Sequence, residues 1–119
     1  GRVAGGDVSV ACWEAEQTSP YHCHPEATEI YVCLSGGGTM RTPDGEARMA
    51  PGCFVVHPPG ELHEYVNGAE QSTLFRVRYG TAMYSRTISW DRNPDWRETA
   101  EDRNYFAARR AERRSGAAG

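Results

Sequence analysis

The sequence contains no lysine, since all 13 of its basic residues are arginine. A lysine that forms a Schiff base and the phosphate-binding lysine of a P-loop are therefore both excluded, which removes two large classes of enzyme. No apolar run approaches the roughly 20 residues that cross a membrane, and no segment has the pattern of a signal peptide. We therefore expect a cytoplasmic protein that contacts no membrane.

A charge imbalance of the kind that attracts nucleic acid is also missing. The formal net charge of the 119 residues is −3. Arginine is dense only in residues 91–119, where 7 arginines are nearly balanced by 6 acidic residues. A solvated helix is typical of such a segment, so we expect no nucleic-acid partner.

The cysteines lack the spacing of a zinc knuckle or of a redox dithiol. The four are Cys12, Cys23, Cys33 and Cys53, and no pair of them forms a C-x-x-C motif. We therefore expect free thiols, which an intracellular chain of this size accommodates as small, partly buried apolar residues.

Residues 1–90 read as one domain of short strands. Glycine and proline recur at close intervals, and the stretches between them are rich in Val, Ile, Tyr, Phe and Thr. The predicted strands are Asp7 to Glu14, Thr28 to Leu34, Gly38 to Thr42, Glu46 to Ala50, Cys53 to His57, Leu62 to Val66, Ser72 to Tyr79 and Met83 to Trp90. Short strands about ten residues apart indicate an all-β antiparallel sandwich or small barrel.

Residues 91–119 form a polar, arginine-rich tail with few aliphatic residues. Thr99 followed by Asp102 is typical of a capped helix start, so we predict a short helix over about 100–113. Its apolar face consists of Tyr105 and Phe106, enough for weak packing on the barrel or on a partner subunit. We expect the last residues, "SGAAG", to be disordered.

Two of the four histidines lie two residues apart, in the stretch "YHCHPEATE". On a strand His22 and His24 point to the same face and Cys23 to the other. Glu29 can reach the same point from the next strand, which gives two imidazoles and one carboxylate, a set that binds transition metals. His63, near the start of a later strand, is the natural fourth ligand.

These residues occur in two motifs that resemble those of the cupin family. The first motif has the form H-x-H-x4-E-x6-G and the second has the form G-x5-P-x-G-x2-H-x3-N. The matching residues are His22, His24, Glu29 and Gly36, then Gly52, Pro58, Gly60, His63 and Asn67. One position departs, because the family usually has a glycine six residues before the first histidine and this chain has Glu16.

The resemblance covers residues 8 to 80. It implies a small cupin of the RmlC-like kind, with a double-stranded β-helix, or jelly-roll, barrel. It also implies one divalent transition metal, bound by His22, His24, Glu29 and His63. Iron is the first expectation, and Zn, Mn, Ni and Cu remain open because mixed imidazole and carboxylate donors accept all of them.

A four-ligand centre leaves coordination positions for a small-molecule substrate. The leading hypothesis is an oxygenase acting on a small, oxygen-rich substrate that binds the metal. The alternatives are a non-redox isomerase, lyase, decarboxylase or polyketide-type cyclase, and a cupin that binds a small molecule without catalysis.

Alternation along the strands nominates further residues of the cavity. Tyr31 and Tyr65 are candidate acid/base groups, with filling of the barrel as the alternative. Asn67 and Arg76 are candidate substrate-binding residues. The expectation for Arg76 and Arg78 is that both face outward; an inward arginine would bind a carboxylate-bearing substrate.

Two features of the strands are left with open interpretations. His57 fits no ligand position and is either an ordinary strand residue or a group that supports a ligand or transfers protons. Ile30, Val32 and Leu34 form an apolar row opposite the metal-binding face, so that face must be covered as well. The cover is the other sheet, the N-terminal strand or a second subunit, and the resemblance to cupins favours a homodimer.

Overall fold

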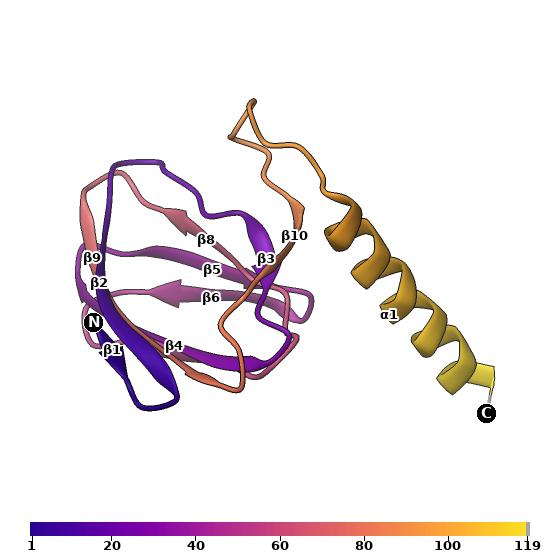
Figure 1. Ribbon diagram of the computed structural model, residues 1–119. Helices are drawn as coiled ribbons and strands as arrows, with labels where there is room; N and C mark the ends of the chain where they lie inside the picture. The colour runs from indigo at the N-terminus through magenta and orange to yellow at the C-terminus, as the bar shows by residue number, and fades with distance from the viewer. Residues whose placement is uncertain (119) are drawn as a thin grey trace.

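The computed structural model describes residues 1–118, which form a β-barrel with one long helix beside it (Figure 1). In chain order the elements are β1 (Arg2–Val3), β2 (Gly6–Trp13), β3 (Tyr21–Cys23), β4 (Ala27–Ser35), β5 (Gly38–Thr42), β6 (Gly45–Met49), β7 (Phe54–His57), β8 (Glu64–Asn67), β9 (Ser72–Gly80), β10 (Arg86–Ser89) and α1 (Ala100–Ala118). Each predicted strand is present close to its predicted bounds. The all-β prediction is therefore confirmed.

The strands form two walls that face each other. One wall is a five-stranded antiparallel sheet in the order β1-β2-β9-β4-β7. The other consists of the sheet β6-β5-β8 and the pair β10-β3, which meet where His22 bridges to His63. Neighbouring strands that are distant in sequence are typical of a jelly-roll, the architecture that the motifs imply.

The glycine that ends the first motif has a steric role. Gly36 has φ of 73°, a left-handed conformation that residues with a Cβ rarely adopt. A Cβ at this position would lie 2.3 Å from Ser72 Oγ and 2.4 Å from the carbonyl oxygen of Gln71. Only glycine therefore allows the end of β4 to pass this close to β9.

An apolar core fills the space between the walls beneath the histidines. Its members are Tyr31, Cys33, Met40, Met49, Tyr65 and Leu74, with Trp13 and Val55 packed against them. Every one of these residues faces inward from a strand, as the alternation of side chains requires. The core fixes the spacing of the two walls, and that spacing sets the distance between groups that approach each other from opposite sheets.

The helix starts where the sequence predicts. The hydroxyl of Thr99 accepts a hydrogen bond from the Asp102 N–H at 3.1 Å, which caps the first turn. Asp102 also accepts from the Thr87 N–H at 3.1 Å, and Phe106 is buried, so α1 is attached to β10. Among the described residues, no helix is both long and apolar enough to cross a membrane.

The helix is longer than predicted. It continues through Ala118 instead of ending near residue 113, while residue 119 lies outside the described residues. The expectation that the last residues are disordered stays a prediction. The physical reason is that alanine, arginine and glutamate dominate this segment and favour helix strongly enough to carry it through Gly116.

Candidate metal centre

The three histidines of the centre come from one wall of the barrel. His22 lies on β3 and His63 just before β8, and the two residues exchange backbone hydrogen bonds of 3.0 and 2.8 Å. His24 follows the end of β3, and its side chain points to the same face as that of His22. This wall therefore presents three imidazoles to the interior.

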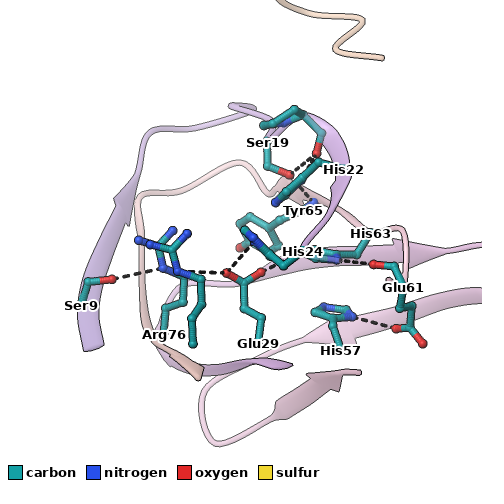
Figure 2. Close-up of polar contacts among 12 residues, drawn as sticks. Ser9, Ser19, His22, His24, Glu29, His57, Glu61, His63, Tyr65 and Arg76 are labelled. Atoms are coloured by element: carbon teal, nitrogen blue, oxygen red, sulfur yellow. Dashed lines mark hydrogen bonds and ion pairs between the residues drawn. The ribbon is translucent and has the colours of Figure 1, made fainter. Parts of the chain in front are cut away.

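Glu29 approaches from the opposite wall, on β4. Potential ligand atoms of His22, His24, Glu29 and His63 all lie within 4.8 Å of one another, and all four residues are buried (Figure 2). The structure thus brings together the four residues that the motifs nominate. Cys23 points the other way, as expected, and its thiol lies 3.9 Å from the Tyr105 hydroxyl on α1.

Backbone carbonyls orient all three imidazoles. The Nδ1 atoms of His22, His24 and His63 lie 2.7, 3.3 and 3.0 Å from the carbonyl oxygens of Pro20, Tyr84 and Glu61, respectively. Since a carbonyl oxygen only accepts, each Nδ1 carries the hydrogen and each neutral ring keeps its lone pair on Nε2. Such support is typical of metal-binding histidines.

The arrangement suits a cation between the side chains. His63 Nε2 lies 2.8 Å from one carboxylate oxygen of Glu29, and His24 Nε2 lies 3.3 Å from the other. With hydrogen on Nδ1, a nitrogen lone pair would face a carboxylate oxygen, which repels it. The buried Oε2 of Glu29 also has no hydrogen-bond partner. A divalent transition metal relieves both problems, so the residues present fit such an ion.

The protonation states also suit a metal. Burial lowers the pKa of His22 to about 3, because the charged imidazolium is poorly solvated there. Burial alone would raise the pKa of Glu29, but the neighbouring side chains of His24 and His63 outweigh it and hold that pKa below its usual value. A neutral imidazole and an ionised carboxylate are the forms that bind metal.

The arginines of β9 face the interior, so the expectation that they point outward is wrong. In the sheet register Arg78 is the cross-strand partner of Glu29, and Arg76 is that of Tyr31. Directly opposite residues of antiparallel strands share a face, and both Glu29 and Tyr31 face inward. Phe75 and its alternating neighbours are therefore the outward residues of β9.

The two arginines differ in how their charge is balanced. Arg78 makes two hydrogen bonds to the carboxylate of Asp7, at 3.1 and 2.8 Å. Arg76 donates from Nε to the Ser9 hydroxyl at 3.1 Å (Figure 2). Within residues 1–118 no carboxylate lies at ion-pair distance from Arg76. Arg76 thus keeps an unbalanced positive charge inside the barrel.

Tyr31 is the cross-strand partner of Arg76 and lies on the same face of β4 as Glu29. Its side chain is buried, and burial together with the nearby carboxylate of Glu29 raises its pKa well above the usual value. The phenol therefore stays protonated and is available as a hydrogen-bond donor.

Tyr65 and Asn67 have their polar groups engaged within the barrel. The Tyr65 hydroxyl donates to the Asn67 side-chain oxygen at 2.7 Å, and its ring packs edge-on against Trp13 with centroids 5.1 Å apart. Asn67 Nδ2 donates to the carbonyl oxygens of Glu14 and Glu70 at 2.8 and 2.9 Å. These contacts tie two loops to β8 and belong to the core.

His57 is the residue beside the centre whose role the sequence left open. Its ring stacks on that of His63, with centroids 3.9 Å apart and planes 5° from parallel. It is 2% exposed, and its Nδ1 lies 2.8 Å from the Glu61 carboxylate. Burial and the neighbouring His63 lower its pKa, so the ring is neutral. Inward positions of a strand usually hold apolar residues. A histidine at such a position is the sequence signal that could have identified His57.

The fold and the cluster define a class of protein, a jelly-roll barrel with three histidines and a glutamate at its centre. A family model described as a cupin domain matches residues 9–77, more than half of the chain. The chain therefore belongs to the cupin domain family.

Curated relatives include sugar isomerases. Over 64 residues, 50% of this chain, the sequence is 41% identical to a glucose-6-phosphate isomerase from Pyrococcus abyssi. It is 38% identical over the same length to the corresponding enzyme from Pyrococcus horikoshii. The match covers 34% of each enzyme, so the chain spans about a third of the length of these relatives.

Solved structures show the same barrel. A sugar phosphate isomerase of the cupin superfamily from Silicibacter pomeroyi has a TM-score of 0.62 and 25% identity, over 71% of this chain and 57% of that one. Oxalate oxidase in complex with the substrate analogue glycolate has a TM-score of 0.64 and 20% identity, over 71% of this chain and 47% of that one. The second likeness is one of fold alone.

Proposed function

We propose that this cupin is a metal-dependent enzyme that acts on a small, oxygen-rich organic molecule bound at the metal centre. The observation that carries the proposal is the convergence of three buried imidazoles and one buried carboxylate, whose potential ligand atoms all lie within 4.8 Å of one another. When bound, a divalent ion there supplies Lewis-acid polarisation of a substrate oxygen and, if it is iron, manganese or copper, electron transfer as well.

The residues around the centre support an anionic substrate. Arg76 has an unbalanced charge and faces inward, and a guanidinium binds carboxylate or phosphate oxygens through paired N–H donors. Tyr31, its cross-strand partner, adds a phenolic O–H donor on the same face of the sheet. Together they bind and orient one end of the substrate while the other end lies at the metal.

Isomerisation of a phosphorylated or carboxylated hydroxy-carbonyl compound is the reaction that the relatives support best. Glucose-6-phosphate isomerases are 38–41% identical to this chain over 64 residues, and a sugar phosphate isomerase has the same fold. In such a reaction the protein binds the anion at Arg76 and excludes bulk water, because all four groups of the centre are buried.

An oxygenase, the leading hypothesis from the sequence, stays a prediction and is the second candidate. Three imidazoles and one carboxylate accept redox-active iron or manganese as readily as zinc. Oxalate oxidase shares the fold, which is compatible with redox chemistry in this barrel.

Turnover with and without dioxygen separates the two candidates. Metal-loaded protein is assayed with aldose and ketose phosphates, with interconversion followed by NMR and oxygen uptake followed by an electrode. The proposal expects equal conversion in anaerobic and aerobic buffer and a KM raised at least tenfold by Arg76→Gln, with Arg48→Gln as a surface control. Conversion that stops without dioxygen would instead support the oxygenase.

We also propose that the outer face of the five-stranded sheet binds a second copy of the chain. Two cross-strand rows of apolar residues cover it, and neither row has a charged member. They are Val10, Phe75, Val32 and Phe54, then Val8, Val77, Ile30 and Val56. Phe54 is 66% exposed and Val10 56% exposed, while the N-terminal strand lies within this sheet instead of covering it. An uncharged face complements itself, as a two-fold dimer requires.

A further inference from the structure

His57 has a buried nitrogen that no group in the described chain satisfies. The residue is 2% exposed, and its Nε2 atom lacks a hydrogen-bond partner. Buried polar atoms are nearly always hydrogen-bonded, so an orphan at the edge of a reactive centre indicates a ligand. The question is which way this atom points and whether it donates or accepts.

Glu61 determines the orientation of two rings at once. Its backbone carbonyl lies 3.0 Å from His63 Nδ1, and its carboxylate lies 2.8 Å from His57 Nδ1. The two rings are stacked and nearly parallel, and both turn their Nδ1 edge toward Glu61 (Figure 2). Their Nε2 edges therefore point the same way, toward the interior where Glu29 lies. Glu29 is also the cross-strand partner of His57.

The same contacts set the hydrogen-bonding role of Nε2. An ionised carboxylate only accepts, so the contact with Glu61 places the hydrogen of a singly protonated His57 ring on Nδ1. Nε2 is then an acceptor beside the metal-binding nitrogen of His63. It is no fifth member of the cluster, because the four groups that lie within 4.8 Å of one another do not include it.

We propose that His57 is a substrate-binding residue whose Nε2 accepts a hydrogen bond from a hydroxyl group of the molecule bound at the metal centre, with Glu61 as the residue that positions it. The inference rests on the proposed function and deepens it. The substrate carries a hydroxyl group on the His57 side of Glu29 and an anionic group on the Arg76 side, because these residues flank β4 from β7 and β9. The class of ligand is therefore a hydroxy acid or a phosphorylated hydroxy compound.

The chain offers closely matched variants. His57→Phe keeps a flat ring that can stack on His63 but removes the acceptor. His57→Gln removes the ring and retains an acceptor. Glu61→Gln keeps a side-chain oxygen that accepts from Nδ1, whereas Glu61→Ala releases the ring.

The test compares lactate with propionate, which differ by one hydroxyl group, in calorimetric titrations of metal-loaded protein. We expect His57→Phe to weaken lactate binding about tenfold, because one hydrogen bond to the hydroxyl group is lost. Propionate binding should be unchanged, because propionate has no hydroxyl group. His57→Gln and Glu61→Gln should keep part of the preference for lactate, and Glu61→Ala should lose it. An unchanged preference in His57→Phe would overturn the inference.

Two measurements without substrate test the inference about His57 separately from the proposed function. In metal-free protein, NMR of the imidazole nitrogens should find His57 protonated on Nδ1; hydrogen on Nε2 would refute the acceptor role. Metal affinity should be the same in His57→Phe as in the unmodified protein, and a large loss would make His57 a ligand instead. If the unmodified protein binds no metal, the proposed function itself fails.

Discussion

At the scale of single residues, the orientation of each histidine ring of the centre depends on a backbone carbonyl group that contacts its Nδ1 atom. Carbonyl oxygens of Pro20, Tyr84 and Glu61 hold the three rings, and they come from three separate segments of the chain. The direction of each lone pair is therefore decided by residues that carry no ligand atom.

Removal of one ligand should abolish metal retention. In His63→Ala the remaining two imidazoles and Glu29 have lost the group that lies 2.8 Å from the carboxylate. We expect less than a tenth of the metal content of the unmodified protein, measured by elemental analysis after dialysis against a weak chelator. His57→Phe is the matched control, because it alters the stacked ring and leaves the four groups in place. Equal metal content in His63→Ala and in the unmodified protein would refute the assignment.

The stability of the metal-free protein should fall as the pH is lowered below neutrality. The folded pKa of His22 is about 3, and an unfolded histidine has a pKa of about 6.5, so between these values the unfolded chain binds a proton that the folded chain excludes. The contribution of His22 to the free energy of unfolding should decrease by about 1 kcal/mol per pH unit from pH 6 to pH 4. Urea unfolding at several pH values measures it, and His22→Gln should show a shallower slope.

Glu16, which replaces the family's usual glycine, is strained. It is the one non-glycine residue with positive φ in the described chain, at 65°. A left-handed backbone costs a residue with a Cβ about 1–2 kcal/mol, and the added freedom of glycine when unfolded offsets part of it. Glu16→Gly should therefore raise the free energy of unfolding by about 0.5–1 kcal/mol in chemical denaturation. Ala15→Gly, where φ is negative, should lower it.

At the scale of elements, α1 depends on few contacts with the barrel. Asp102 and Phe106 are its buried residues, and both lie in its first two turns. Farther along the helix, Arg109 and Arg113 line a pocket with Gly60 and Leu62, so α1 runs beside the barrel beyond its second turn (Figure 1). Its attachment to β10 bears on the centre, because the segment before β10 supplies the Tyr84 carbonyl that orients His24.

Truncation of Phe106 should release the helix. Phe106→Ala truncates the buried apolar side chain of α1, at a cost of about 2–3 kcal/mol to its docking. We expect trypsin to cleave at the helix arginines at least tenfold faster while the barrel remains intact, as judged by mass spectrometry. Asn104→Ala, an exposed change on the same helix, should leave the rate as it is. Equal rates in both variants would show that α1 does not depend on this contact.

At the scale of the whole molecule, the five-stranded sheet has two unlike faces. The inner face carries the carboxylate, the arginines and His57, and the outer face is apolar. A dimer through the outer face would leave every residue of the centre within its own barrel, so assembly and chemistry would be physically separate.

A charge placed on the outer face should separate the subunits. Sedimentation analysis should find the unmodified protein as two copies and Phe54→Glu as one, because a buried carboxylate without a partner is costly at an apolar interface. Ile88→Glu is the control, since Ile88 is 39% exposed but lies on β10, away from this face. A single copy for the unmodified protein would contradict the proposed dimer.

The sequence by itself determined most of the strands and nominated the four residues of the centre. These are encoded locally, because alternation along a strand, the conformations open to glycine and proline, and the spacing of His22, His24 and Glu29 need only short-range geometry. The start of α1 was equally predictable, since Thr99 caps it within one turn.

Only the tertiary structure decided which way β9 faces and what His57 does. Along β9, arginines alternate with apolar residues. This alternation predicts two faces of the strand but does not determine which of them is the inner one. The pairing of β9 with β4 fixes the choice, because Arg76 lies opposite the buried Tyr31. His57 likewise acquires its role from Glu61 and His63, which reach it across a turn and a stacked ring, contacts that exist only once the chain has folded.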